Sequence, residues 1–478
     1  MRPLESRPSA RLPPAAIIDE VVRLYKNNQY SDAASMAACA LQERPGDARL
    51  WNARGVCLRS LRQPAAAIEC YQRALETDPH DAGVWSNLGN ALKDVKQVVS
   101  AITCHRRAVE LAPHSPDFWH NLGIALLADN RPREAVDAFD EALRWRPDDP
   151  KIRWDRSHAL LRLGDYRRGW RDYEARLLTG ALPKRELRSM AWTGQRYTGK
   201  RLVILSEQGF GDTIWAARYF AQAKRLGGEL VVECRPELVS LIRQIGAVDR
   251  VVPRGQPLPE AEYHCYVCSL PGLFTPEVAA IPPAPYLAPP GGDRPGNAVV
   301  ASARGKLRVG IVWSGSTTFE GNVDRAVPLQ RFVQAFALPG VQLFSLQKGE
   351  PRTELQSLSG RSCVIDLAPY MSDFADTAAL VRELDLVIMT DSAVAHLCGA
   401  LGTPVWILLN HVPYWLWLLG REDSPWYPSA RLFRARTWGD WDGVFDAASA
   451  ELLRIPRNRM QGSAAALGVG FSHRPRAG

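Results

Sequence analysis

Aromatic, apolar and small residues return at a fixed step along the first third of the chain. The positions separated by 34 residues are Trp51, Trp85 and Trp119; Gly55, Gly89 and Gly123; Ala74, Ala108 and Ala142; Pro45, Pro79, Pro113 and Pro147; and Tyr71, His105, Phe139 and Tyr173. A 34-residue period that combines a tryptophan, a glycine, a later alanine and a closing proline is the tetratricopeptide pattern of paired helices. The small residues let the helices approach, the aromatic ring fills the groove between them, and proline ends the second helix.

This pattern predicts an α-solenoid of four to five repeats over residues 17–180, preceded by a disordered segment over 1–16. The last repeat is atypical, because Arg153 stands where a further tryptophan is expected. A short solenoid of this kind has a concave face that is suited to binding. Two uses of that face stay open: recognition of a protein or peptide partner, and dimerisation or scaffolding.

Beyond Gly199 the pattern changes to short strand-like runs that alternate with helical stretches. Strands are predicted at RLVILS, ELVVEC, DRVVP and YHCYVCSL, and a helix over residues 212–226. Residues 287–306 are rich in proline and glycine and are predicted to be a linker. The alternation then restarts with LRVGIVW, VQLFSLQ, DLVIMT and PVWILL.

Alternation of this kind predicts parallel, doubly wound sheets. We therefore expect an α + α/β chain, in which the solenoid precedes two Rossmann-like domains over residues 199–286 and 307–455. The stretch 456–478 is polar, contains glycine and arginine, and is predicted to be a disordered tail. In open parallel sheets, ligands bind at the carboxyl ends of the strands, so a site is expected between the two domains.

Composition narrows the function classes. The 478-residue chain has a formal charge of +8, which is compatible with a phosphate-bearing ligand. A block of lysine and arginine with interleaved aromatics, typical of nucleic-acid binding, does not occur. The N-terminal segment lacks the apolar core of a secretory signal, and the apolar runs are too short to cross a bilayer. We expect a cytoplasmic chain without a membrane span.

Three motifs resemble ligand or metal sites but are not favoured as such. The stretch 194–201, GQRYTGKR, has Arg201 where a phosphate loop needs serine or threonine, and it precedes a strand instead of following one. The D-x-D at 440–442 follows the α/β alternation, where a surface or helix-capping role is favoured over a metal site. The C-x-x-C at 265–268 stands alone, so reduced, semi-buried thiols are favoured over zinc or redox chemistry.

The stretch VILSEQGFGDTIW passes from a strand to a helix through two glycines. Gln208, Gly209, Gly211 and Thr213 surround Asp212 at the predicted carboxyl edge of the first sheet. The glycines allow the backbone to come close to a ligand. Asp212 is either an ordinary helix cap or a general base that takes a proton from an attacking hydroxyl.

A second strand-to-helix passage occurs at TDSAVAHL. Asp391 and Ser392 follow the strand LVIMT, and a helix starts at once. Free backbone N–H groups at such a helix end, together with the helix dipole, suit a diphosphate. His396 lies one turn into that helix, where it either contacts a ligand or packs within the fold.

Two further loops end strands at the same predicted edge. One carries Ser314, Gly315 and Arg325, and the other carries Gln347 and Lys348. Each loop combines small or polar residues with a cation, which suits phosphate charge in a site without metal. We expect these loops and the start of the late helix to form one anion-binding site.

The segments EQGFGDTIWAARY, VGIVWSGS, SLQKGE, DFADTAALVRELDLVIMTDSAVAHLCGALGTPVWILL and REDSPWYPSARLFR together resemble bacterial tetratricopeptide-repeat glycosyltransferases. The catalytic part is similar to the heptosyltransferases of glycosyltransferase family nine. This resemblance covers roughly residues 17–455. It implies a GT-B fold, in which two Rossmann-like domains hold a nucleotide-sugar donor mainly through the second domain, with no metal and no cofactor.

The resemblance also assigns roles to residues. Asp212 matches the proposed base of that family, and Asp391, Ser392 and Ala393 match the residues that contact the donor diphosphate. Lys348 follows a strand whose loop lies near the donor. A departure is the lack of a lysine in SGSTTFEGNVDRA, where Arg325 is the nearest cation, so the donor is not assigned to ADP-heptose.

The resemblance therefore predicts transfer of a sugar from a nucleotide-sugar to an acceptor hydroxyl. Because the repeats accompany the catalytic part, a protein acceptor on the concave face is expected. Two alternatives stay open: a repeat scaffold with an inactive transferase domain, and a transferase directed at lipid or polysaccharide.

Overall fold

The computed structural model describes residues 14–455, apart from 181, 184, 290, 293 and 359–362. The chain forms two compact units, Met1–Ala159 and Leu160–Gly478, so the predicted solenoid boundary at 180 falls inside the second unit. Of the two segments predicted to be disordered, residues 1–13 and 456–478 lie outside the described residues, and the first helix begins at Pro14.

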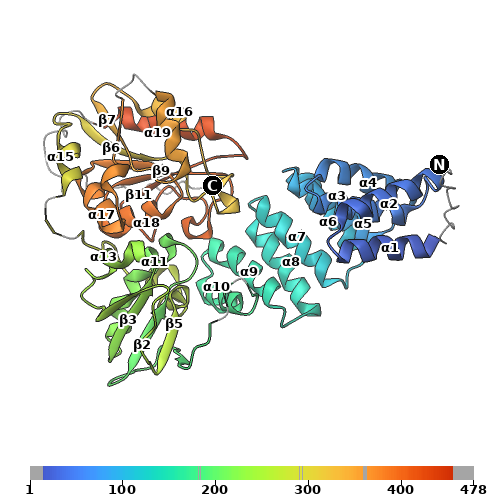
Figure 1. The fold of residues 1–478 in the computed structure, drawn as a ribbon, viewed down its shortest axis with the longest axis horizontal. Helices are drawn as coiled ribbons and strands as arrows, with labels where there is room; N and C mark the ends of the chain where they lie inside the picture. The colour runs from blue at the N-terminus through green and yellow to red at the C-terminus, as the bar shows by residue number, and fades with distance from the viewer. Residues whose placement is uncertain are drawn as a thin grey trace, which may run out of the picture. The chain divides into compact units, whose positions relative to one another are not determined.

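The first unit consists of helices that pack in consecutive antiparallel pairs (Figure 1). These helices are α1 (Pro14–Lys26), α2 (Tyr30–Glu43), α3 (Ala48–Ser60), α4 (Pro64–Thr77), α5 (Ala82–Asp94), α6 (Val98–Leu111), α7 (Pro116–Ala128), α8 (Pro132–Trp145) and the start of α9 (Pro150–Leu163). Val21, Leu58, Leu75 and Leu92 contribute to their shared apolar core. The predicted helical solenoid is confirmed.

The 34-residue period corresponds to two recurring contacts. The indole N–H of each repeated tryptophan donates to the carbonyl of the proline six residues earlier, as in Trp51 to Pro45 at 2.8 Å and Trp85 to Pro79 at 2.9 Å. Each repeated glycine lies against the aromatic position of the next helix. A methyl group at Gly55 would lie 2.5 Å from the ring of Tyr71, so only glycine admits this approach.

The second unit begins with α10 (Tyr166–Tyr173) and a 3₁₀ turn over Glu174–Leu177, followed by a parallel sheet with the strand order β1-β5-β2-β3-β4. Its strands are β1 (Met190–Ala191), β2 (Arg201–Leu205), β3 (Glu229–Cys234), β4 (Arg250–Pro253) and β5 (Tyr263–Tyr266). Its helices are α11 (Phe210–Ala216), α12 (Phe220–Lys224), α13 (Val239–Ile242) and α14 (Leu270–Phe274).

Two local predictions for this sheet need correction. The strand predicted over 263–270 ends at Tyr266, and a 3₁₀ turn over Val267–Ser269 leads into α14. The helix predicted over 212–226 starts earlier, at Phe210, and is interrupted by a 3₁₀ turn over Ala217–Tyr219. The apolar pattern of these stretches continues through both changes, so periodicity alone did not locate them.

A second parallel sheet has the order β11-β10-β9-β6-β7-β8. Its strands are β6 (Leu307–Val312), β7 (Val341–Ser345), β8 (Val364–Asp366), β9 (Leu386–Thr390), β10 (Val405–Leu409) and β11 (Ala430–Arg434). Its helices are α15 (Pro295–Ala301), α16 (Leu329–Phe336), α17 (Phe374–Glu383), α18 (Ala393–Leu401) and α19 (Trp441–Leu453). The predicted linker over 287–306 thus includes α15, and the prediction of two parallel α/β sheets is confirmed.

The helices of the described residues are all too short or too polar to cross a membrane.

His105 provides a test of the repeat packing. It takes the place of Tyr71 and Phe139 in the period, is fully buried against Gly89, and neither ring nitrogen has a hydrogen-bond partner among the described residues. Burial, helped by the nearby charges of Lys93 and Arg59, lowers the pKa of His105 from 6.5 to about 4. At a pH between these two pKa values, His105 is protonated in the unfolded chain but not in the folded chain. The free energy of unfolding therefore falls as the pH drops from about 6.5 to 4.

We expect this histidine to cost about 2–3 kcal/mol of stability between pH 7.5 and pH 4.5, from 1.36 kcal/mol per pKa unit. The variant His105→Phe should lose that part of the pH dependence, because phenylalanine occupies the same position at 139. Thermal unfolding followed by circular dichroism at both pH values measures the difference from the wild type. The exposed His80→Gln serves as control, and an equal pH response in wild type and His105→Phe contradicts the prediction.

Candidate functional site at the carboxyl edges of the two sheets

The loop after β2 places Asp212 at the edge of the first sheet. Helix α11 begins at Phe210, so Asp212 lies in its first turn, where one carboxylate oxygen accepts the N–H of Gly209 at 2.8 Å. The side chain is half-buried. Burial raises the pKa of Asp212 to about 6; the hydrogen bond from Gly209 opposes the rise, and the carboxylates of Glu207 and Asp391 add to it.

Helix α11 is also where the first α/β half meets the second. A methyl group at Gly211 would lie 2.6 Å from Cδ2 of His396 on α18. The ring of Phe210 lies 5.0 Å from the ring of Phe374, the first residue of α17. The glycine at 211 therefore permits close packing of the two halves at the residue next to Asp212.

A buried arginine in the 3₁₀ turn after α11 joins the same halves. Arg218 donates twice to the carbonyl oxygen of Trp426, both times at 3.1 Å, and once to that of Trp215 at 3.0 Å. Its guanidinium lies 4.7 to 5.0 Å from the rings of Tyr286, Trp426 and Tyr427. Because Trp426 precedes β11 and Arg218 follows α11, this arginine links the two sheets of the unit.

At the edge of the second sheet, Gln347 joins the loops that follow β6 and β7. Its carbonyl oxygen accepts the N–H groups of Trp313 and Ser314, at 3.1 and 3.0 Å, and its amide donates to the carbonyls of Ser314 and Lys348. The hydroxyl of Ser314 accepts from Asn322 at 3.0 Å, and Asn322 also accepts the N–H of Gly315 at 2.8 Å. The predicted residues Ser314, Gly315 and Gln347 are therefore brought together, and their polar groups bond mainly to one another.

The two predicted cations of this edge differ in their surroundings. Lys348 is exposed, and its ammonium donates to the carbonyl of Met371. Arg325 is half-buried, lies against the exposed ring of Phe319 at 4.8 Å, and makes a long contact of 3.5 Å with Asn322. Among the described residues, no carboxylate lies within ion-pair distance of Arg325, so its charge is available to an anion.

The start of α18 lies at the same edge, after β9. Ser392 is its N-cap residue, but the Ser392 side chain makes no capping hydrogen bond. Asp391 is buried, which raises its pKa, while the charge of Arg325 opposes the rise. The start of α18, with Ala393, thus follows a carboxylate on which the charge of Arg325 acts.

His396 is held inside the fold. Its Nδ1 lies 3.0 Å from the hydroxyl of Tyr427, its ring stacks on that of Trp417, and its Cδ2 and Nε2 lie against Gly211. Burial lowers the pKa of His396 to about 3, and the charges of Arg218 and Arg325 add to this effect. The imidazole is therefore neutral at physiological pH, and its contacts are those of a packed residue; a donor contact stays a prediction.

The acceptor-side residues occupy distinct environments. Thr213 is buried, Gly209 donates to Asp212, and the amide of Gln208 donates to the hydroxyl of Tyr173 at 3.1 Å. Gln208 has a φ of 46°, a left-handed backbone conformation that is uncommon outside glycine. This strained residue stands four positions before Asp212.

The motifs set aside earlier have structural roles. Asp440 caps α19 by accepting the N–H of Gly443 at 3.1 Å, which confirms the capping role, and Asp442 pairs with Arg331. Cys265 and Cys268 are buried, and burial raises the pKa of both thiols. Within the described part of the chain, no group of three or more histidine, cysteine or acidic residues is arranged to hold a metal ion.

Sequence reasoning missed the residues that hold the site in place, above all Arg218, Asn322 and Arg176. Arg218 contacts Trp426, 208 positions away, and no local pattern marks such a pair. Arg176 did carry a signal. It occupies the position 34 residues after Ala142, where the period expects a small residue.

Residues 48–81 and 116–149 match family models of the tetratricopeptide repeat. These matches confirm the repeats that the 34-residue period predicts. They cover part of the helical region and none of the α/β region.

The chain is 30% identical to Protein FlbA of Caulobacter vibrioides over 358 residues. The alignment covers 67% of this chain and 58% of FlbA, so the chain spans little more than half the length of that relative. Similar solved structures include pilF of Pseudomonas aeruginosa (24% identity, TM-score 0.33, 35% of this chain and 76% of that chain) and MamA (17%, 0.31, 33% and 92%). A third is YrrB, described as a TPR protein with an unusual peptide-binding site (17%, 0.30, 33% and 82%).

The contact between Gly211 and His396 leads to a stability prediction. We expect Gly211→Ala to destabilise the α/β unit by about 1–3 kcal/mol, the usual cost of overpacking a filled space. The histidine cannot move aside easily, because Tyr427 and Trp417 hold its ring. Differential scanning calorimetry should show a lower melting temperature. Gly246→Ala is the matched control, because no atom lies within 4 Å of the added methyl group; equal melting temperatures for both variants would refute the prediction.

Proposed function

We propose that the α/β unit is a glycosyltransferase of the GT-B type, which moves a sugar from a nucleotide-sugar donor to an acceptor hydroxyl without a metal ion. The observation that carries the proposal is the pairing of two groups at the edges of the sheets. Asp212 is a half-buried carboxylate with a pKa of about 6 within the electrostatic reach of Asp391. Arg325 is a cation whose charge influences the same Asp391 and has no described carboxylate partner.

The second sheet supports the donor side of this proposal. A diphosphate would be bound by the guanidinium of Arg325, the hydroxyl of Ser392 and the free N–H groups that open α18. These groups would also stabilise the negative charge of the departing nucleoside diphosphate. Lys348 would add charge from the exposed loop after β7.

The first sheet supports the acceptor side. In the proposed reaction, Asp212 takes the proton of the acceptor hydroxyl while that oxygen forms a bond to the anomeric carbon. The bond from the anomeric carbon to the phosphate oxygen breaks at the same time, and the nucleoside diphosphate leaves. A base with a pKa of about 6 is ionised at neutral pH and still basic enough to assist this transfer.

The tetratricopeptide repeats support a polypeptide as the acceptor. Repeat arrays of this kind provide extended binding surfaces. Adjacent first helices of the repeats are joined by polar side chains at a step of 35, as in Asn52 with Asn87 and Ser86 with Asn121, both at 3.0 Å. The half-buried amides of this stripe, such as Asn87 and Asn121, could hydrogen-bond the backbone of an extended protein segment.

Donor binding is tested first. Arg325→Gln should weaken the binding of a nucleoside diphosphate at least 10-fold, because a charge-assisted hydrogen bond to phosphate is lost. Isothermal titration calorimetry with UDP, GDP and ADP identifies the base and measures the loss. Arg331→Gln is the control, since Arg331 lies on α16 and pairs with Asp442. The proposal of this donor site is wrong if no nucleotide binds to the wild type, or if both variants bind the nucleotide equally.

The role of Asp212 as the base is tested by the rate of sugar transfer and by its dependence on pH. Asp212→Asn should reduce sugar transfer by about 100-fold or more, the usual contribution of a general base, while nucleotide binding is retained. In the wild type the rate should rise with pH through about 6 and then level off, because the protonated carboxyl cannot accept a proton. Asp442→Asn, at an exposed position, is the control. Transfer by Asp212→Asn at more than half the wild-type rate would exclude Asp212 as the base.

A further inference from the structure

The fourth period of the repeat departs from the first three at Arg153 and also at the small position of its second helix. Ala74, Ala108 and Ala142 are completely buried in the helical array. The position 34 residues further on is Arg176, and the matching aromatic position is Tyr173. The aromatic residue is therefore kept at the end of the array, whereas the small alanine is replaced by a long cation.

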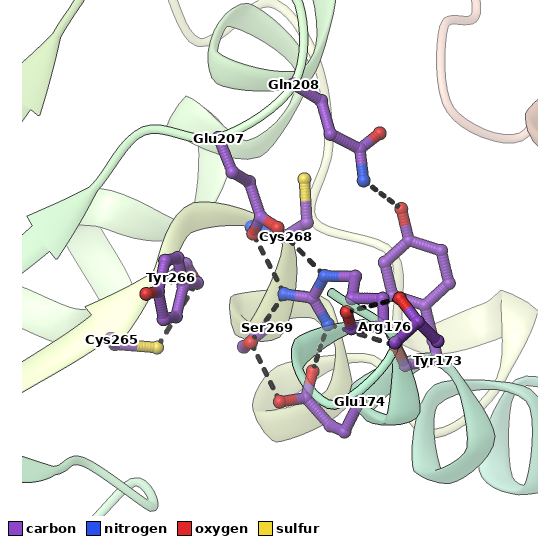
Figure 2. Close-up of polar contacts among 10 residues, drawn as sticks. Tyr173, Glu174, Arg176, Glu207, Gln208, Cys265, Tyr266, Cys268 and Ser269 are labelled. Carbon is purple, nitrogen blue, oxygen red and sulfur yellow. Dashed lines mark hydrogen bonds and ion pairs between the residues drawn. The ribbon is translucent and has the colours of Figure 1, made fainter. Parts of the chain in front are cut away.

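Arg176 is only 1% exposed, and all its donors have partners (Figure 2). Nε and Nη2 each donate to one carboxylate oxygen of Glu207 at 2.8 Å, which makes a two-pronged ion pair. Nη2 also donates to the hydroxyl of Ser269 at 2.8 Å, and Nη1 donates to the carboxylate of Glu174 and the carbonyl of Tyr173. The arginine thus connects the end of the helical segment to the loop that follows β2.

Residues 206–211, which comprise the loop after β2 and the first residues of α11, are held from several sides. Glu207 also accepts the N–H of Cys268 at 2.9 Å. The next residue, Gln208, donates to the hydroxyl of Tyr173 at 3.1 Å (Figure 2). The carbonyl of Gln208 accepts from Arg235 at 3.3 Å. A non-glycine residue at a φ of 46° persists only where surrounding contacts determine its conformation. Arg176 and Tyr173, from the same short segment, supply two of those contacts.

Stability alone does not account for this arginine. Burying an ion pair costs desolvation energy that the pair recovers only in part. Apolar side chains of similar volume often stabilise a fold equally or better. The array itself uses alanine at the three preceding positions. A planar fork of donors, in contrast, fixes the orientation of a carboxylate.

We propose that Arg176 is a positioning residue for sugar transfer, which acts by locking Glu207 and thereby setting the loop that carries Asp212. This inference rests on the proposed function of Asp212 as the base. It assigns part of the catalytic arrangement to the segment that ends the repeats. Arg176 itself touches no reacting atom.

The charge of Arg176 must be distinguished from its geometry, because several groups surround Asp212. The groups that influence it or lie beside it are Glu207 in its own loop, Tyr173 from α10, Cys268 after β5, Asp391 after β9, His396 on α18 and Tyr414 after β10. Arg176→Lys keeps the positive charge opposite Glu207 but removes the two-pronged contact. It therefore tests positioning without removing the counter-charge.

For Arg176→Lys we expect kcat to fall at least 10-fold, with the donor Kd and the acidic limb of the pH–rate profile unchanged. Hydrogen exchange followed by mass spectrometry should show faster exchange of the backbone amides over residues 206–212. Unchanged kcat together with unchanged exchange overturns the proposal. A merely structural weakening would instead raise exchange throughout the unit and also affect donor binding.

Arg308→Lys is the matched control, because Arg308 makes a similar two-pronged pair with Asp385, at 2.6 and 3.0 Å, at the amino end of β6. It should leave kcat and the exchange of residues 206–212 at wild-type values. If Arg176→Lys does not fold, the double variant Arg176→Met with Glu207→Gln removes both buried charges. Wild-type kcat and exchange in that variant would equally overturn the proposal.

The exchange measurement also separates this inference from the proposed function. If the wild type transfers no sugar but Arg176→Lys loosens residues 206–212, the transferase proposal fails while the locking role of Arg176 stands. If the wild type transfers sugar and neither kcat nor exchange responds to the substitution, the locking role fails while the transferase proposal stands.

Discussion

The contact between Gly211 and the ring of His396 determines how closely the two α/β halves approach. The ring cannot yield, because Tyr427 binds its Nδ1 and Trp417 stacks on its face. Enlarging the glycine is unfavourable, because a side chain at residue 211 would overlap the ring. Asp212 is the next residue, so this packing contact also sets the position of the candidate base relative to Asp391. The raised pKa of Asp212 follows from that position, since the same packing removes water and brings other carboxylates near Asp212.

Two buried arginines hold the chain before and after Gly211, and oxygen atoms of different segments accept from each of them. Arg218 binds the carbonyl of Trp426 across the two halves, whereas Arg176 binds the carboxylate of Glu207 at the end of β2. A guanidinium removed from water is tolerated only when its donors have partners. Such a group therefore fixes several segments at once, which is a stricter requirement than apolar packing makes. The site is held by these polar contacts, and the sheets supply the framework.

The parts of this arrangement that depend on neighbouring positions in the chain could be predicted from the sequence. The contact of Gly55 with Tyr71 could be predicted from their spacing, because the same two positions recur in each 34-residue helix pair. The edge positions of Asp212 and Ser392 follow from where strands end. The contact of Arg218 with Trp426 could not be predicted, because it depends on how two separately wound sheets meet. The bonding of Gln347 to Trp313 and Ser314 could not be predicted either, because it depends on the adjacency of β6 and β7. A contact of Gln347 with a donor stays a prediction.

The replacement of alanine by Arg176 changes where the α/β unit begins. Trp170 donates to the carbonyl of Thr275 at 3.0 Å, and the hydroxyl of Tyr166 accepts from the indole of Trp426. Residues of α10 therefore contact both halves of the α/β unit, although their spacing continues that of the repeats. If the unit began at Gly199, where the strand pattern starts, it would not include Arg176. Glu207 would then be a buried carboxylate without its two-pronged ion-pair partner. Since such a carboxylate is strongly unfavourable, the final turn of the helical segment has to be counted as part of the unit that holds Asp212.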